Sequence, residues 1–168
     1  MNYKERVQNC CSLDELLHIW KEKGVVQTSY VDNGAKVPLT IDHRNVFISD
    51  GIVNPEEWKK CRKKILFVLK EAYGGDSDWS LTKELSTRAP WSSIWKRIAE
   101  WTYGIFNTTD SVPAKYEPSK ISMAENNPWL NRIAVINLKK SGGGSSSNAK
   151  EIEAYALSDR MEIKNRLN

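Results

Sequence analysis

The sequence contains few of the residues that build disulfide-linked or metal-bound folds. Of its 168 residues, three are cysteine and two are histidine. Cys10 and Cys11 are adjacent and Cys61 stands alone, so no Cys-x-x-Cys pair or spaced histidine pair matches a zinc-binding pattern. We therefore expect neither a disulfide framework nor a metal site, and we expect a reducing, cytoplasmic setting. Nothing in the sequence indicates a cofactor.

Long apolar runs are also missing. No stretch approaches the ~20 apolar residues that a membrane-spanning helix needs. The N-terminal residues, MNYKERVQNCCSLDELLHIW, are charged and amphipathic and lack the organisation of a secretory signal peptide. Hydrophobic residues make up 40% of the chain and charged residues 27%, as in ordinary globular proteins. We predict a single domain, residues 1–168, without membrane association.

Tryptophan and positive charge are what the sequence has in quantity. The chain holds seven tryptophans and a formal net charge of +4. Five of the six residues from Lys59 to Lys64 are basic, which favours binding to phosphate backbones, although a solvated helix face is the alternative. Most tryptophans are expected in the core. Trp79 and Trp129 fall in predicted loops, where they could instead stack on bases or contact a protein partner.

Residues 1–45 predict a helix followed by a hairpin. Ser12 and Glu15 form a capping-box pattern, which predicts a helix that ends near Gly24. In VVQTSYVDNGAKVPLTI, the Asp-Asn-Gly sequence at 32–34 favours a tight turn between two strands. Residues 46–168 form the rest of the domain. They open with a short helix, because Asn54 and Pro55 precede two acidic residues.

Two apolar runs predict the central strands. Ile65–Leu69 and Ile133–Leu138 are typical of strands buried on both faces. Between them, Trp91–Ile105 is predicted to be a helix that packs on the sheet. Its apolar stripe consists of Trp91, Ile94, Trp95, Ile98 and Ile105. Residues 107–128 are polar with three prolines and predict a long loop. These elements predict an α/β fold, an open parallel-core sheet flanked by helices.

The stretch NLKKSGGGSSSN, residues 137–148, has two interpretations. Its composition is that of a flexible linker. Its position, after a strand and before a helix capped by Asn148, is that of a loop whose backbone N–H groups bind an anion. That helix is expected to continue to residue 167, with Ile152, Ala156, Ile163 and Leu167 along one face. We predict phosphate or nucleic-acid contacts from Lys59, Lys60, Lys63, Lys64, Lys139, Lys140, Gly142, Gly143, Gly144 and Ser145.

The turn KEAYGGD, residues 70–76, should share a cleft with this loop, because ligands bind beyond the carboxyl ends of parallel strands. At this point residues 46–168 resemble the uracil-DNA glycosylase superfamily. Lys70-Glu71-Ala72-Tyr73-Gly74 is similar to the Gly-Glu-Ala-Pro-Gly motif of one branch. Asn137, at the end of AVIN, occupies the place of the asparagine that pairs with the flipped base in that family. The resemblance implies an incomplete three-layer sandwich, with base or ligand contacts from Asn137, Tyr73, Gly74 and Gly75.

The departures from the family pattern concern catalysis. The family's water-activating aspartate falls at Ala72, and its turn-shaping proline falls at Tyr73. Its late histidine motif would follow two further strands, whereas His18 and His43 lie upstream. The resemblance is therefore to a C-terminally shortened relative. An enzyme would have to use Glu71 or Asp76 as its general base.

We predict a catalytically incomplete, glycosylase-like protein that binds single-stranded DNA, RNA or a nucleoprotein. A small basic binder of this kind would suit a phage or mobile-element inhibitor of a nucleic-acid-guided bacterial defence system, as anti-CRISPR proteins are. Two alternatives remain. One is an active base-excising glycosylase or related hydrolase. The other is a protein–protein interaction module that uses the tryptophans and the 107–128 loop.

Overall fold

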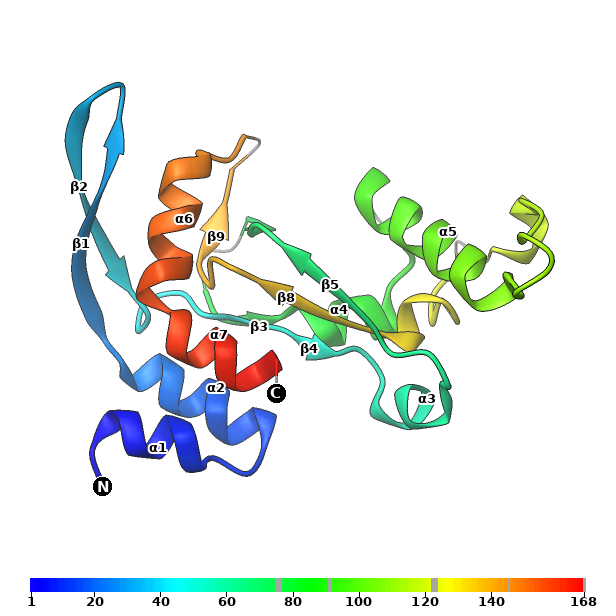
Figure 1. The fold of residues 1–168 in the computed structure, drawn as a ribbon, viewed down its shortest axis with the longest axis horizontal. Helices are drawn as coiled ribbons and strands as arrows, with labels where there is room; N and C mark the ends of the chain where they lie inside the picture. The colour runs from blue at the N-terminus through cyan, green and yellow to red at the C-terminus, as the bar shows by residue number, and fades with distance from the viewer. Residues whose placement is uncertain (75–76, 91, 122–123, 145, 168) are drawn as a thin grey trace. The chain divides into compact units, whose positions relative to one another are not determined.

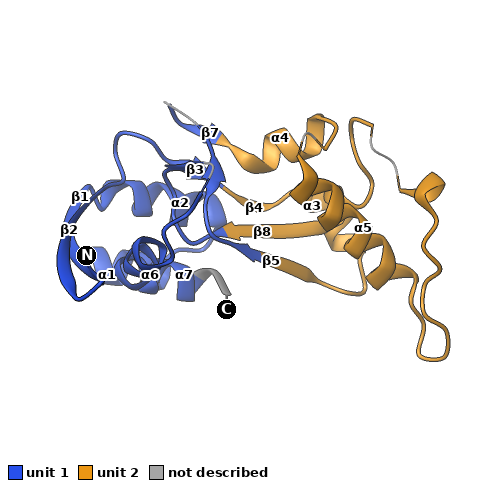
Figure 2. Ribbon diagram, turned by 90° about the horizontal axis from the view of Figure 1, so that it is seen from above, with its two compact units in different colours: residues 1–49, 68–79, 137–168 blue, residues 50–67, 80–136 orange. Residues whose placement is uncertain are grey.

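The structure is a computed structural model that describes residues 1–74, 77–90, 92–121, 124–144 and 146–167. These residues form seven α-helices, two 3-10 helices and nine short strands in small sheets, a mixed α/β architecture (Figure 1). Four residues named above, Gly75, Asp76, Trp91 and Ser145, lie outside the described residues. The chain divides into two compact units (Figure 2). Unit 1 contains residues 1–49, 68–79 and 137–168, and unit 2 contains residues 50–67 and 80–136.

Each unit has its own helices and strands. Unit 1 holds α1 (Tyr3–Asn9), α2 (Leu13–Glu22), β1 (Val25–Asp32), β2 (Ala35–Asp42), β3 (Ile48–Ser49), β6 (Ala72–Tyr73), β9 (Gly142–Gly143), α6 (Ala149–Ser158) and α7 (Arg160–Leu167). Unit 2 holds β4 (Gly51–Ile52), α3 (Pro55–Lys60), α4 (Leu81–Thr87), α5 (Ser93–Asn107), η1 (Pro118–Lys120) and η2 (Leu130–Arg132). Residues of β5 (Ile65–Leu69), β7 (Trp79–Ser80) and β8 (Ile133–Asn137) fall in both.

The predicted N-terminal helix is confirmed as α2. The Glu15 N–H donates to Ser12 Oγ at 3.1 Å, but the Glu15 carboxylate accepts from the Cys11 N–H rather than completing the box. A complete capping box lies instead at α1, where Asn2 and Glu5 each donate a backbone N–H to the other's side chain at 2.9 Å. Both helices therefore begin at capped ends.

The predicted hairpin is also confirmed. β1 and β2 pair antiparallel from Val25 opposite Asp42 to Asp32 opposite Ala35, joined by a two-residue turn. Asn33 and Gly34 have φ values of 47° and 79°. A type I′ turn requires positive φ at both central residues, which Asn-Gly tolerates. The local sequence therefore determines both the turn and the register.

A buried ionic cluster holds the N-terminal and C-terminal segments of unit 1 together. Lys23 Nζ lies 2.9 Å from Asp159 Oδ1 and 3.1 Å from Glu162 Oε1. His43 Nε2 lies 3.1 Å from the same Asp159 oxygen, and the Tyr3 hydroxyl donates to Glu162 at 2.6 Å. Both carboxylates are completely buried. A charge in such surroundings is tolerated only with partners, so these contacts fix where each segment ends.

One wrong prediction concerns the segment of the ionic cluster that carries Asp159. The helix expected to run unbroken to residue 167 ends at Ser158, and α7 begins at Arg160. Asp159, between them, is the C-cap of α6 and donates its N–H to the Tyr155 carbonyl at 2.9 Å. Lys23 and His43 contact its carboxylate. The predicted continuous helix is therefore two helices, interrupted at Asp159.

The two predicted central strands are adjacent and parallel. β8 lies between β4 and β5 in a three-stranded sheet (Figure 1). The Leu138 N–H donates to the Leu69 carbonyl at 3.0 Å, and the Lys139 N–H donates to the Lys70 carbonyl at 2.9 Å. Residue numbers rise together along the two segments, which is the parallel arrangement. β8 is buried throughout, as predicted. β4 pairs with β8 antiparallel, so the sheet is mixed.

The prediction that β5 is buried on both faces is wrong. Leu66 is 40% exposed and Val68 is 54% exposed, while the alternate residues are partly covered. Leu66 and Val68 point to the same face of the sheet, and that face of β5 is open to solvent. The apolar run alone does not show whether both faces of a strand are covered.

Helix α5 forms as predicted but presents a different face to the core. Its buried residues are Trp95, Ile98, Ala99, Thr102 and Tyr103, whereas the predicted Ile94 and Ile105 are exposed. The Tyr103 ring meets Trp129 edge-on, with centroids 5.1 Å apart. This contact beside η2 turns the 95–103 face inward. The predicted stripe was therefore only partly correct.

Replacing Lys23 with Met should strongly destabilise the protein. The change leaves two fully buried carboxylates without their lysine, and breaking a buried ion pair from one side typically costs about 3–5 kcal/mol. Urea unfolding at pH 7 measures the loss. Lys21→Met is the matched control, because Lys21 pairs with Asp78 near the surface, where a pair contributes about 0–1 kcal/mol. Equal effects of the two changes would contradict the role of the ionic cluster.

The stability difference between the parent and Lys23→Met should depend on pH. Burial opposes ionisation of Asp159, but the adjacent His43 and Lys23 together hold the pKa of its carboxyl below the usual value. Its stabilising contribution is therefore present above the unfolded pKa, about 3.9, and is lost as pH falls through the lower folded pKa. The difference in free energy of unfolding between the parent and Lys23→Met should therefore become smaller below about pH 4.

Candidate functional site

The two loops singled out in the sequence lie side by side in unit 1. β6 pairs in parallel with β9, with Ala72 opposite Gly142 and Tyr73 opposite Gly143. The Gly74 N–H donates to the Gly143 carbonyl at 3.2 Å. The linker interpretation is therefore wrong for these glycines, because they form a strand against the turn that follows β5.

Glu71 and Lys139 form the centre of a network at these loops. Ser147 Oγ donates to Glu71 Oε1 at 2.5 Å, and Lys139 Nζ lies 3.1 Å from Glu71 Oε2 and 2.9 Å from Glu151 Oε1. The side chains of Glu71 and Lys139 are 7% and 12% exposed. Burial lowers the pKa of Lys139, but the two carboxylates outweigh it and raise that pKa. The three charged groups sum to one negative charge, which does not favour an added phosphate.

The packing of Glu71 in this network requires a glycine at position 143. A Cβ atom on Gly143 would lie 2.6 Å from Glu71 Oε1 and closer still to Cγ and Cδ of the same side chain. Gly144 has only ordinary contacts. The sequence shows the glycines, but not that a glutamate seventy residues earlier in the chain packs on one of them.

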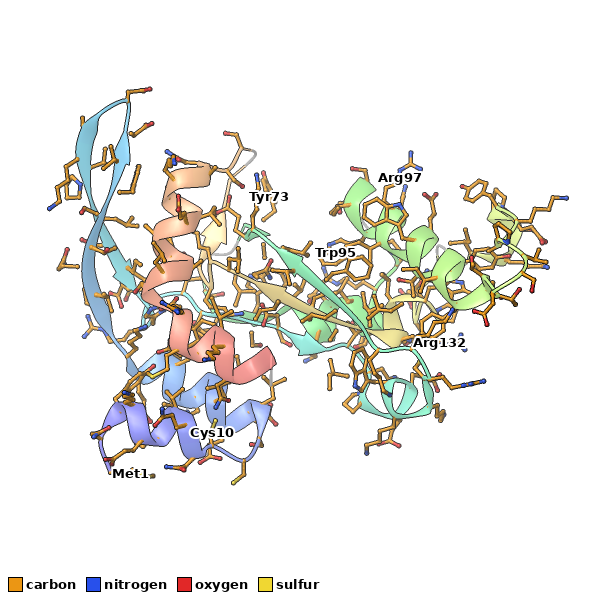
Figure 3. The ribbon with its side chains drawn as sticks, viewed as in Figure 1. Met1, Cys10, Tyr73, Trp95, Arg97 and Arg132 are labelled. Atoms are coloured by element: carbon orange, nitrogen blue, oxygen red, sulfur yellow. The ribbon has the colours of Figure 1, made fainter. Side chains whose placement is uncertain are left out.

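The other predicted ligand residues of unit 1 have contrasting environments. Lys140 is 1% exposed, and its Nζ lies 4.6 Å from the centroid of the Trp20 ring. Asn137 is completely buried at the end of β8. Neither side chain is at the surface, where a phosphate or base could reach it. Tyr73 is well exposed (Figure 3), and Gly74 has a positive φ of 76°.

Within the basic run, two lysines on α3 form surface ion pairs. Lys59 Nζ lies 3.0 Å from Glu56 Oε1, and Lys60 Nζ lies 2.8 Å from Glu57 Oε1. Both are i,i+3 pairs on exposed side chains, and such pairs contribute little to stability. These lysines stay close to solvent and can exchange a glutamate for another anion at small cost.

The next two lysines bind the ends of helices. Lys63 Nζ donates to the carbonyls of Ile105 at 2.6 Å and Thr108 at 3.2 Å, at the C-terminal end of α5. Lys64 Nζ donates to the Trp58 carbonyl near the end of α3. A cation there complements the helix dipole, although the Trp58 carbonyl also accepts the Cys61 N–H at 3.1 Å. The basic run therefore has a structural role that the sequence pattern did not indicate.

A hollow of about 640 Å³ in unit 2 brings this run together with residues that the sequence did not single out. We call it the basic cleft. It is lined by Glu57, Lys60, Cys61, Arg62, Lys63, Phe106, Thr108, Thr109, Asp110 and Arg132. Four of these are cationic and two are acidic. The Thr108 and Thr109 hydroxyls donate to the carbonyls of Gly104 and Val112, so the four cations are what suits the lining to an anionic ligand.

Arg132 is the part of the basic cleft that the sequence analysis missed. Its guanidinium carbon lies 5.0 Å from the centroid of the Trp129 ring and 5.8 Å from that of Phe106 (Figure 3). Its Nε lies 3.9 Å from Glu57 Oε2. The stacked rings hold the guanidinium in place without neutralising it. Phe106 comes from a distant segment, which the sequence pattern could not show, whereas Trp129 lies only three residues before Arg132 and the two were not connected in the sequence analysis.

The whole net charge of the protein lies in unit 2. Unit 2 has twelve Lys and Arg residues against eight Asp and Glu residues, or +4, and unit 1 has thirteen of each, or zero. The sequence total of +4 is therefore concentrated in about half of the chain. This separation strengthens attraction of anions to unit 2 and not to unit 1.

Comparison with known proteins adds no relative. No protein-family model matches the chain, and no match was found among curated proteins or solved structures. The glycosylase resemblance rests on the motifs quoted above. Within the described ranges, no group of three or more His, Cys, Asp or Glu side chains could hold a metal ion. No helix in that part of the chain is long and apolar enough to cross a membrane.

Changing Gly143 to Ala should destabilise unit 1, because its Cβ would overlap the Glu71 side chain. Overpacking of this kind typically costs about 1–3 kcal/mol. Thermal unfolding followed by circular dichroism measures the loss. Gly144→Ala is the matched control and should be close to neutral. Adding Glu71→Ala to Gly143→Ala should recover part of the lost stability. If the effects of the two changes simply add, the predicted overlap between position 143 and the Glu71 side chain is contradicted.

Proposed function

We propose that this chain binds nucleic acid through the basic cleft of unit 2. The observation that carries the proposal is the concentration of the net charge of +4 in unit 2, around a hollow lined by four cations. Nucleic acids attract such clusters because binding releases the counterions condensed on the phosphates. Lysine, arginine and hydroxyl donors are the groups that contact phosphate oxygens in known complexes.

The residues of the basic cleft can perform this task without rearranging the fold. Lys60 has only a surface partner, so a phosphate can replace Glu57 at little cost. Arg62 is exposed, and its guanidinium offers the planar pair of donors that suits phosphate. Lys63 contributes its charge at the rim while it remains bonded to α5. Arg132 offers a second guanidinium, supported by its rings.

We further propose that the glycosylase-like turn of unit 1 is not catalytic. A general base must reach the water or proton that it acts on. Glu71 is instead nearly buried and bound by Lys139 and Ser147, which supports a structural role for it. Ala72 occupies the place of the family's water-activating aspartate. A binding protein with an incomplete glycosylase-like centre is the function that these residues support best.

Removing two positive charges from the basic cleft should weaken binding and its salt dependence. The double variant Lys60→Gln/Arg62→Gln should lower the slope of log Kobs against log salt by roughly 0.7–0.9 per lost phosphate contact. Fluorescence anisotropy with a labelled 20-nucleotide probe, between about 50 and 200 mM salt, measures this slope.

The matched control is Lys4→Gln/Lys36→Gln, which removes two exposed charges from unit 1. It should leave the slope near that of the parent. If the control lowers the slope as much as the cleft variant does, the binding is diffuse and the basic cleft is not its site.

The protein should not excise uracil. Ala72 stands where the family has its water-activating aspartate, and Glu71 is held by Lys139 and Ser147, so neither position supplies a general base that can activate water. Single- and double-stranded uracil-containing DNA, followed by alkaline cleavage of abasic sites, should show no breaks above background. Breaks that vanish in Glu71→Gln would show that Glu71 is catalytic and would overturn the proposal of an inactive centre.

A further inference from the structure

A second hollow adjoins the basic cleft in unit 2. It has a volume of about 610 Å³ and is lined by Lys63, Glu100, Trp101, Gly104, Ile105 and Thr108. We call it the aromatic shelf. Lys63 and Thr108 line both hollows, so the two share a rim. The shelf is open at Gly104, where a side chain would meet no heavy atom within 4 Å.

Trp101 gives the aromatic shelf a flat, supported ring. Trp101 is 54% exposed, so a large apolar ring lies at the surface of α5. The indole stacks on Phe67, with ring centroids 6.4 Å apart and an interplanar angle of 19°. One face of the indole is thus supported by a strand residue, and the exposed remainder is available to a ligand. Ile105 extends the apolar surface next to it.

We propose that a base of single-stranded nucleic acid stacks on Trp101 while the neighbouring phosphates lie in the basic cleft. Proteins that bind single strands combine a cationic groove along the backbone with aromatic side chains under the bases. The basic cleft and the aromatic shelf are this combination, and their shared rim lets one strand occupy both. In a duplex the faces of the bases are stacked on their neighbours, so they cannot occupy the shelf.

This inference rests on the proposed function and adds to it the class of ligand and the residue that contacts the base. Charge favours a nucleic-acid strand over an apolar protein segment as the occupant. The rim carries Lys63, and the adjoining basic cleft carries three further cations, against Glu57 and Asp110 in the cleft and Glu100 in the shelf. The Glu100 carboxylate is paired with Arg97 at 2.8 Å. The Lys63 bonds to the Ile105 and Thr108 carbonyls hold that charge between the two hollows.

The test measures binding of a labelled 12-nucleotide oligo-dT and of a 12-base-pair duplex by fluorescence anisotropy. Trp101→Ala should weaken oligo-dT binding roughly 5- to 150-fold, the range expected for loss of one stacked base. Trp101→Phe, which keeps a ring, should lose much less. The salt slope should stay unchanged in both variants, because no phosphate contact is removed. Leu157→Ala, which removes an exposed apolar side chain from unit 1, is the control and should bind as the parent does. Tyr73→Ala tests the competing site predicted from the sequence in unit 1.

The outcomes separate this inference from the proposed function. If the parent binds oligo-dT and duplex equally and Trp101→Ala binds as well as the parent, the stacking inference is wrong and cleft binding stands. If the parent binds neither probe, the proposed function fails and the inference fails with it. If Tyr73→Ala weakens oligo-dT binding and Trp101→Ala does not, the base lies on unit 1 and the inference is overturned. Circular dichroism of each variant confirms that it folds.

Discussion

Helix C-termini leave carbonyl oxygens without partners inside the helix, and unit 2 satisfies them with lysines. Lys63 donates to two carbonyls at the end of α5, and Lys64 donates to carbonyls at the end of α3. Lys63 links the segment between α3 and β5 to the end of α5, and Lys64 links it back to α3. They also place positive charge on the rim shared by the basic cleft and the aromatic shelf. The candidate site depends on this arrangement.

Sequence patterns predicted the elements whose cause is local. The Asn33-Gly34 turn, the Asn54 cap of α3 and the apolar run of β8 each carry their signal within a few residues, and the structure contains each of them. The pairing of β5 with β8 also followed, because two apolar strands joined through a helix favour a parallel arrangement.

Elements determined by distant contacts could not be predicted in this way. The helix break falls at Asp159, whose carboxylate contacts Lys23 and His43, which lie more than a hundred residues earlier in the chain. The exposure of Leu66 and Val68 on β5 depends on whether another element covers that face of the sheet, which an apolar run does not reveal. The inward face of α5 is set by Tyr103 against Trp129, a pairing between separate segments. Each of these errors concerns a feature that local periodicity does not determine.

The same distinction applies to the candidate site. The sequence shows two lysines before the glycines of the Gly-rich loop. It does not show that Glu71 and Glu151 pair with Lys139, or that Lys140 is buried over Trp20. It shows a total charge of +4, but not that the charge belongs to unit 2. Once the partners are known, the anion-binding potential lies with the basic cleft rather than with the Gly-rich loop. Arg132 and the threonines join the site only through the fold.

The most direct measurement is a titration of the isotope-labelled protein with oligo-dT, followed by the backbone amide signals in two-dimensional NMR. This experiment reports every part of the chain at once and needs no substitution. The account predicts that the largest shifts fall on Arg62, Thr108 and Thr109 around the basic cleft. Shifts confined to the Gly142–Gly144 loop and to Tyr73 would place the ligand on unit 1 and contradict the account.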